Sequence, residues 1–470
     1  MQDASTNHNL SPNAADSGLF RISQFRLRGG TKLLMVYVVV AAFYAGWMTG
    51  FTFVFSEAKL WPNYNMLARS FAKGQLHLDD QVAEDYVWVN GRSYMYAGPV
   101  PALVRLPVLL VFKRGIPTGL MVALFCAGVS VFFVATLNLV ALPVLSRSAS
   151  QIRIIFALVM VLNGFSLFMV TIPSFHHEAI ACAMFFLMAA IYLFFRTKYS
   201  SYRPGIWIAI LLGAAMGLCL GSRLSYAASV GLLALMIAGG ILRNWDSQRR
   251  REMAKTGAIA FATVGLAAAL LMAYNYSRYG SVFETGMTYQ ASYLFGEYFR
   301  NGNYFRYDHL PHNLWSYFFR MPEVVPHFPF LALPAYLMKV DSVRYLPYHL
   351  IYLNELSVSV FCLAPILLFM VYPLVSRLLD LGDPPAPNYG TLAAIFLLQV
   401  IPVSLTVGTA ARYYYDFLPI AALMAYLGAL QLSRRARLTV LFVAILGVLS
   451  IVLGLSLPLQ AVGFYRAVIS

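Results

Sequence analysis

A short turn between two long apolar runs holds three ionisable residues. The turn reads Pro173-Ser-Phe-His-His-Glu178 and contains His176, His177 and Glu178. Ionisable groups are costly to keep at the mouth of a membrane-embedded helical bundle, so their presence favours a functional role. Glu178 could orient an acceptor or help to hold a divalent ion, and His177 could hydrogen-bond a phosphate or a sugar. Alternatively, Glu178 only caps the following helix, where the helix dipole favours an anion.

Isolated arginines are the second group of residues whose chemistry is suggestive. Arg223 and Arg412 each stand alone in a short turn, and Arg105 lies within a short apolar segment at 99–112. A guanidinium is planar and can bind phosphate through two parallel hydrogen bonds. These arginines are therefore candidates for binding the phosphate of a substrate. Alternatively, Arg223 and Arg105 reach toward lipid headgroups, and Arg412 forms an i,i+4 ion pair with Asp416.

The composition shows what kind of framework must position these residues. The 470 residues are 60% hydrophobic and only 11% charged, against about 25% charged in an ordinary soluble domain. Apolar runs of about twenty residues, long enough to cross a membrane, recur along the chain. The four cysteines lie within such runs and predict neither a disulfide framework nor a zinc site. The net charge of +15 comes from basic residues that separate the apolar runs, which indicates a membrane protein and no nucleic-acid partner.

We predict an all-α integral membrane fold with about eleven spans. The spans lie near 33–55, 116–145, 154–173, 178–195, 205–221, 224–242, 256–276, 356–376, 390–408, 417–432 and 438–457. Lysine and arginine concentrate in alternate connections, and the positive-inside rule then places the N-terminus in the cytoplasm. The predicted organisation is a cytoplasmic tail at 1–32, a transmembrane domain at 33–457 with long outer loops at 56–115 and 277–355, and an outer tail at 458–470.

The first outer loop has a pattern of its own. Tyr64, Leu67, Ala68 and Phe71 recur at helical spacing and predict a short helix lying in the membrane interface. Two β-compatible runs then flank Asn90-Gly91, which is a strong hairpin signal. The apolar segment at 99–112 is too short for a normal span and predicts a second interfacial or re-entrant helix.

Several motifs in this order resemble the GT-C glycosyltransferases, the superfamily of protein O-mannosyltransferases and lipid A aminoarabinose transferases. The motifs are Tyr64-Asn-Met-Leu-Ala68, Gly74-Gln-Leu, Gly91-Arg-Ser-Tyr94, Gly98-Pro-Val-Pro-Ala102, Gly217-Leu-Cys-Leu-Gly-Ser-Arg223, Tyr274 to Gly286, and Arg412-Tyr-Tyr-Tyr-Asp-Phe-Leu-Pro419. The resemblance implies an enzyme that moves a sugar from a polyprenyl-phosphate carrier with inversion. Such an enzyme needs a carboxylate for the acceptor proton, cations for the departing phosphate and a groove for the isoprenoid.

The resemblance also suggests which acids act. The family usually carries a carboxylate just before the interfacial helix, where this chain has Leu60 and Trp61. The nearest acid is Glu57, and Asp85 is its rival because the hairpin returns it toward the same surface. A second acid of the family lies at the tip where this chain has Glu178. Glu284, early in the aromatic-rich second loop, is a minor candidate.

We therefore expect a multi-pass glycosyltransferase of the bacterial inner membrane with an extracytoplasmic active site. Its donor would be a polyprenyl-phosphate-linked sugar and its acceptor a cell-envelope glycan, lipid or protein, with membrane lipids as further partners. The identity of the sugar and a requirement for a divalent metal are left open. Alternatives are a lipid-linked oligosaccharide flippase or other transporter, a polysaccharide polymerase, or a non-catalytic scaffold. A transporter should show an internal repeat, and the sequence has no convincing one.

Overall fold

The computed structural model of the chain is mostly helical and belongs to a multi-pass membrane protein. It describes residues 28–55, 63–79, 86–141, 148–199, 205–243, 248–290, 298–339, 351–381, 386, 388–436 and 438–469. Within these residues, seven helices are at least 18 residues long and apolar enough to cross a membrane, and five apolar helices are shorter. Each of the eleven predicted spans overlaps helical segments, although the number of crossings stays a prediction.

The first half of the chain supplies most of the long helices. They are α2 (Arg28–Met48), α5 (Thr118–Ala141), α6 (Ala149–Leu162), α7 (Gly164–Thr171), α8 (Phe175–Tyr199), α9 (Ile206–Ser222), the 3-10 turn η2 (Leu224–Tyr226), α10 (Ala227–Arg243) and α11 (Gln248–Tyr279). The predicted span at 154–173 is split at Asn163, whose side-chain oxygen accepts a hydrogen bond from Ser166 N at 2.8 Å. Asparagine is a favoured N-cap, so a new helix, α7, begins there.

The described part of the first long loop contains two helices and a hairpin at the predicted positions. Helix α3 (Asn63–Ala72) buries Tyr64, Leu67 and Ala68. Strands β1 (Val87–Val89) and β2 (Arg92–Tyr94) pair antiparallel around Asn90-Gly91, both of which have positive φ angles, as a two-residue hairpin turn requires. Helix α4 (Val100–Phe112) follows. The position of this loop outside the membrane stays a prediction.

The second half of the chain is more irregular than its sequence predicts. Its helices are α13 (Leu310–Phe318), α14 (Val360–Leu363), α15 (Tyr372–Leu378), α16 (Tyr389–Ser404), α17 (Leu418–Leu432), α18 (Thr439–Gly454) and α19 (Ser456–Ile469). Its 3-10 segments are η3 (Met287–Tyr289), η4 (Tyr307–His309), η6 (Pro365–Val371) and η7 (Ala411–Asp416). The predicted single span at 356–376 is thus broken into three pieces, and most of the predicted tail at 458–470 is helical.

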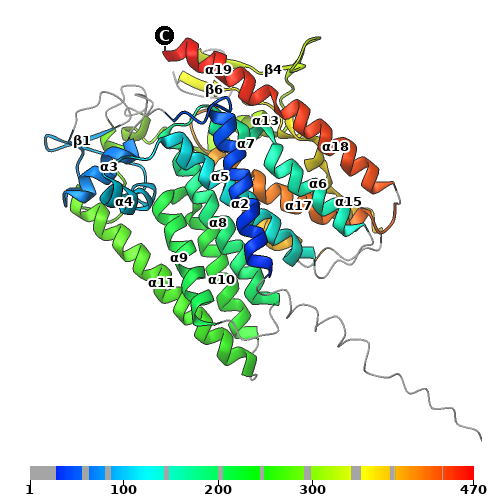
Figure 1. Cartoon of the computed structure of the whole chain (residues 1–470), viewed down its shortest axis with the longest axis horizontal. Helices are drawn as coiled ribbons and strands as arrows, with labels where there is room; N and C mark the ends of the chain where they lie inside the picture. The colour runs from blue at the N-terminus through cyan, green and yellow to red at the C-terminus, as the bar shows by residue number, and fades with distance from the viewer. Residues whose placement is uncertain are drawn as a thin grey trace, which may run out of the picture.

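The second long loop also contains strands that the sequence analysis did not predict. Strands β3 (Glu323–Val324) and β4 (Leu331–Ala332) form a small hairpin. Strand β6 (Ile351–Glu355) pairs antiparallel with β5 (Ala335–Lys339) and parallel with β7 (Thr409–Ala410). The pairing with β7 brings the end of the loop against the segment that precedes α17. In Figure 1 the elements of both long loops cover the same end of the helical bundle.

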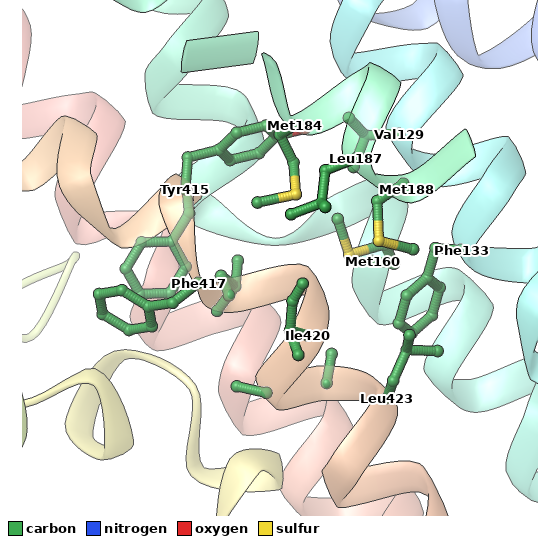
Figure 2. Packing of buried hydrophobic residues seen from close by; sticks show 14 of the residues in the cluster. Val129, Phe133, Met160, Met184, Leu187, Met188, Tyr415, Phe417, Ile420 and Leu423 are labelled. Carbon is green, nitrogen blue, oxygen red and sulfur yellow. The ribbon is translucent and has the colours of Figure 1, made fainter. Parts of the chain in front are cut away.

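The main core lies where α5, α6, α8 and α17 meet (Figure 2). The labelled residues there are Val129, Phe133, Met160, Met184, Leu187, Met188, Tyr415, Phe417, Ile420 and Leu423. The contact between α7 and α18 is closer still, because a Cβ on Gly164 would lie only 1.7 Å from the backbone oxygen of Gly454. These contacts fix α8 and η7 relative to each other, and both carry candidate site residues.

Candidate functional site: two arginines beside a tyrosine

Arg223 lies between α9 and η2, where its backbone N–H still closes the last turn of α9 onto Cys219 O at 3.1 Å. Its Nη2 lies 3.3 Å from Asp416 Oδ2, and its Nε donates to Ser225 Oγ at 3.0 Å. The guanidinium carbon is 5.2 Å from the centre of the Tyr413 ring. Because 22% of the side chain remains exposed, Arg223 is held in place without being sealed from a ligand.

Asp416 is the fixed end of this arrangement. It is fully buried at the end of η7, and the Tyr226 hydroxyl donates to its Oδ1 at 2.6 Å. Burial raises the pKa of the Asp416 carboxyl, and the charge of Arg223 partly offsets that rise. A buried carboxylate needs both a counter-charge and hydrogen bonds, and here Arg223 and Tyr226 provide them.

Arg412 approaches the same tyrosine from its own position in η7. Its guanidinium carbon is 5.3 Å from the Tyr413 ring centre, and its Nη1 donates to Glu355 Oε2 at 2.6 Å. Glu355 is placed there because it pairs with Ala410 in the parallel β6–β7 ladder. The predicted i,i+4 ion pair of Arg412 is therefore replaced: Arg412 pairs with Glu355, and Asp416 pairs with Arg223.

His177 lies within reach of the charge of Arg412. It is 1% exposed, and its Nδ1 is 2.7 Å from Ser174 Oγ. Among the described residues, no hydrogen-bond partner faces its buried Nε2. The ring of His176 lies 3.9 Å from that of Phe175. A buried ring nitrogen without a partner is a feature that a ligand oxygen would satisfy.

Glu178 and Arg105 form a buried pair that is separate from the two-arginine group. Arg105 Nε donates to Glu178 Oε1 at 2.9 Å, and its Nη2 donates to Glu178 Oε2. Its Nη1 donates to Asn65 Oδ1 at 2.7 Å and to the carbonyl of Ile116. All three nitrogens of Arg105 are thus engaged within the protein, and the pair links α3, α4 and α8. Arg105 is only 1% exposed, so in this arrangement it is not accessible to a phosphate.

The remaining candidates lie apart or outside the described residues. Glu284 accepts hydrogen bonds from Gly286 N at 2.6 Å and Thr288 Oγ1 at 2.8 Å, so it organises the turn that enters η3. Glu57 and Asp85 fall outside the residues that the structure describes. Within the described part of the chain, no three His, Cys, Asp or Glu side chains come together as metal ligands. A divalent metal at Glu178 therefore does not fit the described residues, because Arg105 already engages both oxygens of that carboxylate.

Sequence reasoning identified the arginines but missed what holds them. Glu355 and Tyr413 were not candidates, and Asp416 was considered only as a partner of Arg412. Tyr304 from the second long loop also reaches the group, because it is hydrogen-bonded to Tyr413. The one available signal was the Arg412-Tyr-Tyr-Tyr-Asp416 run itself, in which a cation, an aromatic ring and an acid occur together.

Comparison with solved structures finds similarities that include the following two proteins. One is the archaeal oligosaccharyltransferase AglB from Archaeoglobus fulgidus in complex with an inhibitory peptide and a dolichol-phosphate, at 13% identity and a TM-score of 0.47. The match covers 93% of this chain but only 56% of that protein. The other is ArnT from Cupriavidus metallidurans bound to undecaprenyl phosphate, at 10% identity and a TM-score of 0.44, covering 92% of this chain and 76% of that one.

No family model matches the sequence, and no curated protein matches it.

Proposed function

We propose that this protein is a membrane glycosyltransferase that moves a sugar from a polyprenyl-phosphate donor to an extracytoplasmic cell-envelope acceptor. The observation that carries the proposal is the pair of guanidiniums beside Tyr413, each oriented by its own carboxylate. The proposed setting is the bacterial inner membrane, with the N-terminus in the cytoplasm and the site on the opposite side. The motifs of the first loop and the lone outer arginines of the sequence support the same function.

Arg223 and Arg412 suit a phosphate better than a neutral ligand. A guanidinium has five N–H donors in a fixed plane, so it can meet several phosphate oxygens at once. The carboxylates keep both guanidiniums from turning away toward lipid headgroups. In a poorly hydrated site, oriented donors stabilise developing negative charge far more strongly than they do in water. His177 Nε2, if protonated as the donor tautomer, would add a third hydrogen bond.

The proposed reaction follows from this placement. An acceptor hydroxyl attacks the anomeric carbon on the face opposite the phosphate, and the bond from that carbon to the phosphate oxygen breaks. The electron pair of that bond stays on the phosphate oxygen, where Arg223 and Arg412 stabilise the added charge. A carboxylate takes the proton of the attacking hydroxyl. Glu57 is the proposed base and Asp85 its rival.

Glu178 is better suited to positioning than to proton transfer. Its carboxylate is fully buried and both of its oxygens accept from Arg105. A base must reach the proton that it removes, and this pair faces inward between α3, α4 and α8. We therefore assign Glu178 and Arg105 to holding the interfacial helices against the bundle.

The test uses the full chain in detergent and undecaprenyl phosphate as the probe. Arg223→Ala and Arg412→Ala should each weaken binding by roughly 10- to 100-fold, because a hydrogen bond to a charged group contributes about 1.5–3 kcal/mol. Arg223→Lys should recover only part of the affinity, since an ammonium cannot reproduce a two-pronged contact. Arg92→Ala is the matched control, because Arg92 is an exposed arginine of β2 outside the site.

Transfer is measured separately, as loss of sugar from a lipid-linked donor pool extracted from bacterial membranes. Arg223→Ala should slow it by roughly 10²-fold or more, by analogy with removing one transition-state donor. Unchanged binding and transfer in both alanine variants would refute the phosphate site. Binding that depends on both arginines, together with no transfer by the wild-type chain, would favour the transporter alternative.

A further inference from the structure

A hydrophobic hairpin projects from the second long loop. Its tip, Val324 to Phe330, reads Val-Val-Pro-His-Phe-Pro-Phe and contains no Asp, Glu, Lys or Arg. Val324 is 79% exposed, Phe328 52% and Phe330 41%. In Figure 1 the hairpin stands clear of the helices, beside the junction of α18 and α19. Apolar side chains gathered in this way on a surface usually mark a contact with another phase or molecule.

A second group of exposed apolar side chains lies on and just after α13, which precedes the hairpin in the chain. Trp315 and Phe319 are 58% and 60% exposed, and their rings stack at 5.6 Å. Met321, which follows them, is 75% exposed. This group includes a tryptophan, a residue that is enriched at the membrane–water boundary.

Gln460 holds the base of the hairpin against a helix. Leu333 N donates to Gln460 Oε1 at 2.8 Å, and Gln460 Nε2 donates to Leu331 O. Gln460 lies in α19, within Thr439–Val462, a helical stretch that is apolar and long enough to cross a membrane. The base of the hairpin is therefore held beside a candidate membrane-spanning stretch.

We infer that this hairpin and the exposed face of α13 insert their aromatic side chains into the interfacial layer of the lipid bilayer. Lipid is the occupant because Gln460 holds the hairpin beside a helical stretch that is apolar and long enough to cross a membrane, and because residues 324–330 contain no Asp, Glu, Lys or Arg. The insertion stops at the interface. A two-stranded hairpin has open backbone edges, and unpaired N–H and C=O groups are too costly within the hydrocarbon core.

Depth-dependent quenching tests this inference on the full chain in phospholipid vesicles. Phe328→Cys is labelled with a fluorophore sensitive to polarity. It is made together with Cys362→Ser, because Cys362 is partly exposed whereas the other three cysteines are buried. Asn301→Cys in the same background is the matched control, because Asn301 is exposed in a polar turn of the same loop. The label at 328 should be quenched by nitroxides near the lipid headgroup and protected from aqueous iodide, whereas the label at 301 should show the reverse.

Gln460→Leu provides a second measurement, because it removes the two hydrogen bonds at the base of the hairpin and leaves the tip unchanged. Quenching of the label at 328 by shallow nitroxides should fall in this variant. Equal iodide quenching at 328 and 301 would overturn the inference. Protection from iodide without quenching by lipid nitroxides would assign the surface to a protein partner or a second copy of the chain, and would equally overturn the lipid assignment.

Discussion

Arg223 Nη2 and Asp416 Oδ2 lie 3.3 Å apart, although one residue follows α9 and the other ends η7. The carboxylate is fully buried, whereas the guanidinium keeps 22% of its side chain exposed. The two ends of this ion pair thus have different surroundings. Asp416 acts as the anchor, and Arg223 keeps part of its side chain accessible.

The Asp416→Asn variant tests whether Asp416 orients the Arg223 guanidinium or only balances its charge. The amide keeps the shape and can still accept from Tyr226, but it removes one negative charge from the site. We expect undecaprenyl phosphate to bind as well as before or more tightly, while the transfer rate falls because Arg223 is no longer fixed. Steady-state kinetics and probe binding, measured side by side, check this split. Tyr226→Phe keeps the charge of Asp416 and should lower the transfer rate by less. If Asp416→Asn lost probe binding and transfer rate in parallel, the positioning role of Asp416 would be contradicted.

Glu178 and Arg105 should behave as a structural pair. Removing one partner leaves a buried charge uncompensated, so Arg105→Met should cost about 3–5 kcal/mol of stability. Replacing both residues with Met should restore much of that loss. Thermal unfolding in detergent measures both changes. A Glu178→Gln variant that unfolds at the wild-type temperature but no longer transfers sugar would instead give Glu178 a chemical role.

The burial of His309, in the second long loop, should make the folded protein less stable in acid. The side chain is 1% exposed, and burial lowers its pKa to about 4. Between its ordinary pKa of about 6.5 and about 4, the unfolded chain binds a proton at His309 and the folded chain does not. The free energy of unfolding therefore falls as the pH falls through this window. The melting temperature in detergent should drop from pH 7 to pH 5 by less in His309→Gln than in the wild type; an identical drop would exclude His309 as the source.

The orientation of the chain has its own test. The distribution of Lys and Arg places the second long loop outside and the start of α11 inside. In intact cells, a membrane-impermeant maleimide should label Asn301→Cys directly and Arg251→Cys only after permeabilisation. Labelling of Arg251→Cys from outside would reverse the topology and move the proposed site to the cytoplasm.

Local patterns in the sequence predicted the local structure well. Helix α3 and the β1–β2 hairpin depend on side-chain spacing and on one Asn-Gly pair, both of which are readable in a short window. The apolar runs likewise predicted where helices lie. They did not reveal the break at Asn163, because the residues on both sides are equally apolar and a single capping side chain decides the matter.

The sequence did not predict the contacts between segments that are far apart along the chain. Nothing near Arg105 in the sequence indicates that Glu178 is its partner, and the two-residue strand β7 is too short to leave a pattern. The partner of Arg412 was misassigned for this reason: Asp416 is its neighbour along the chain, whereas Glu355 arrives only through the β6–β7 pairing. The isolation of Arg223 in a short turn was a signal in the sequence, but nothing in the sequence identified Asp416 as its partner.

The contact between Gly164 and Gly454 also has a consequence for the order of assembly. Helix α7 belongs to the first half of the chain, yet its first residue packs against the backbone at the end of α18 with no room for a side chain. During synthesis this contact cannot form until Gly454 has left the ribosome. The helices that precede α18 must therefore be inserted while one face of α7 is uncovered, and α18 covers that face later.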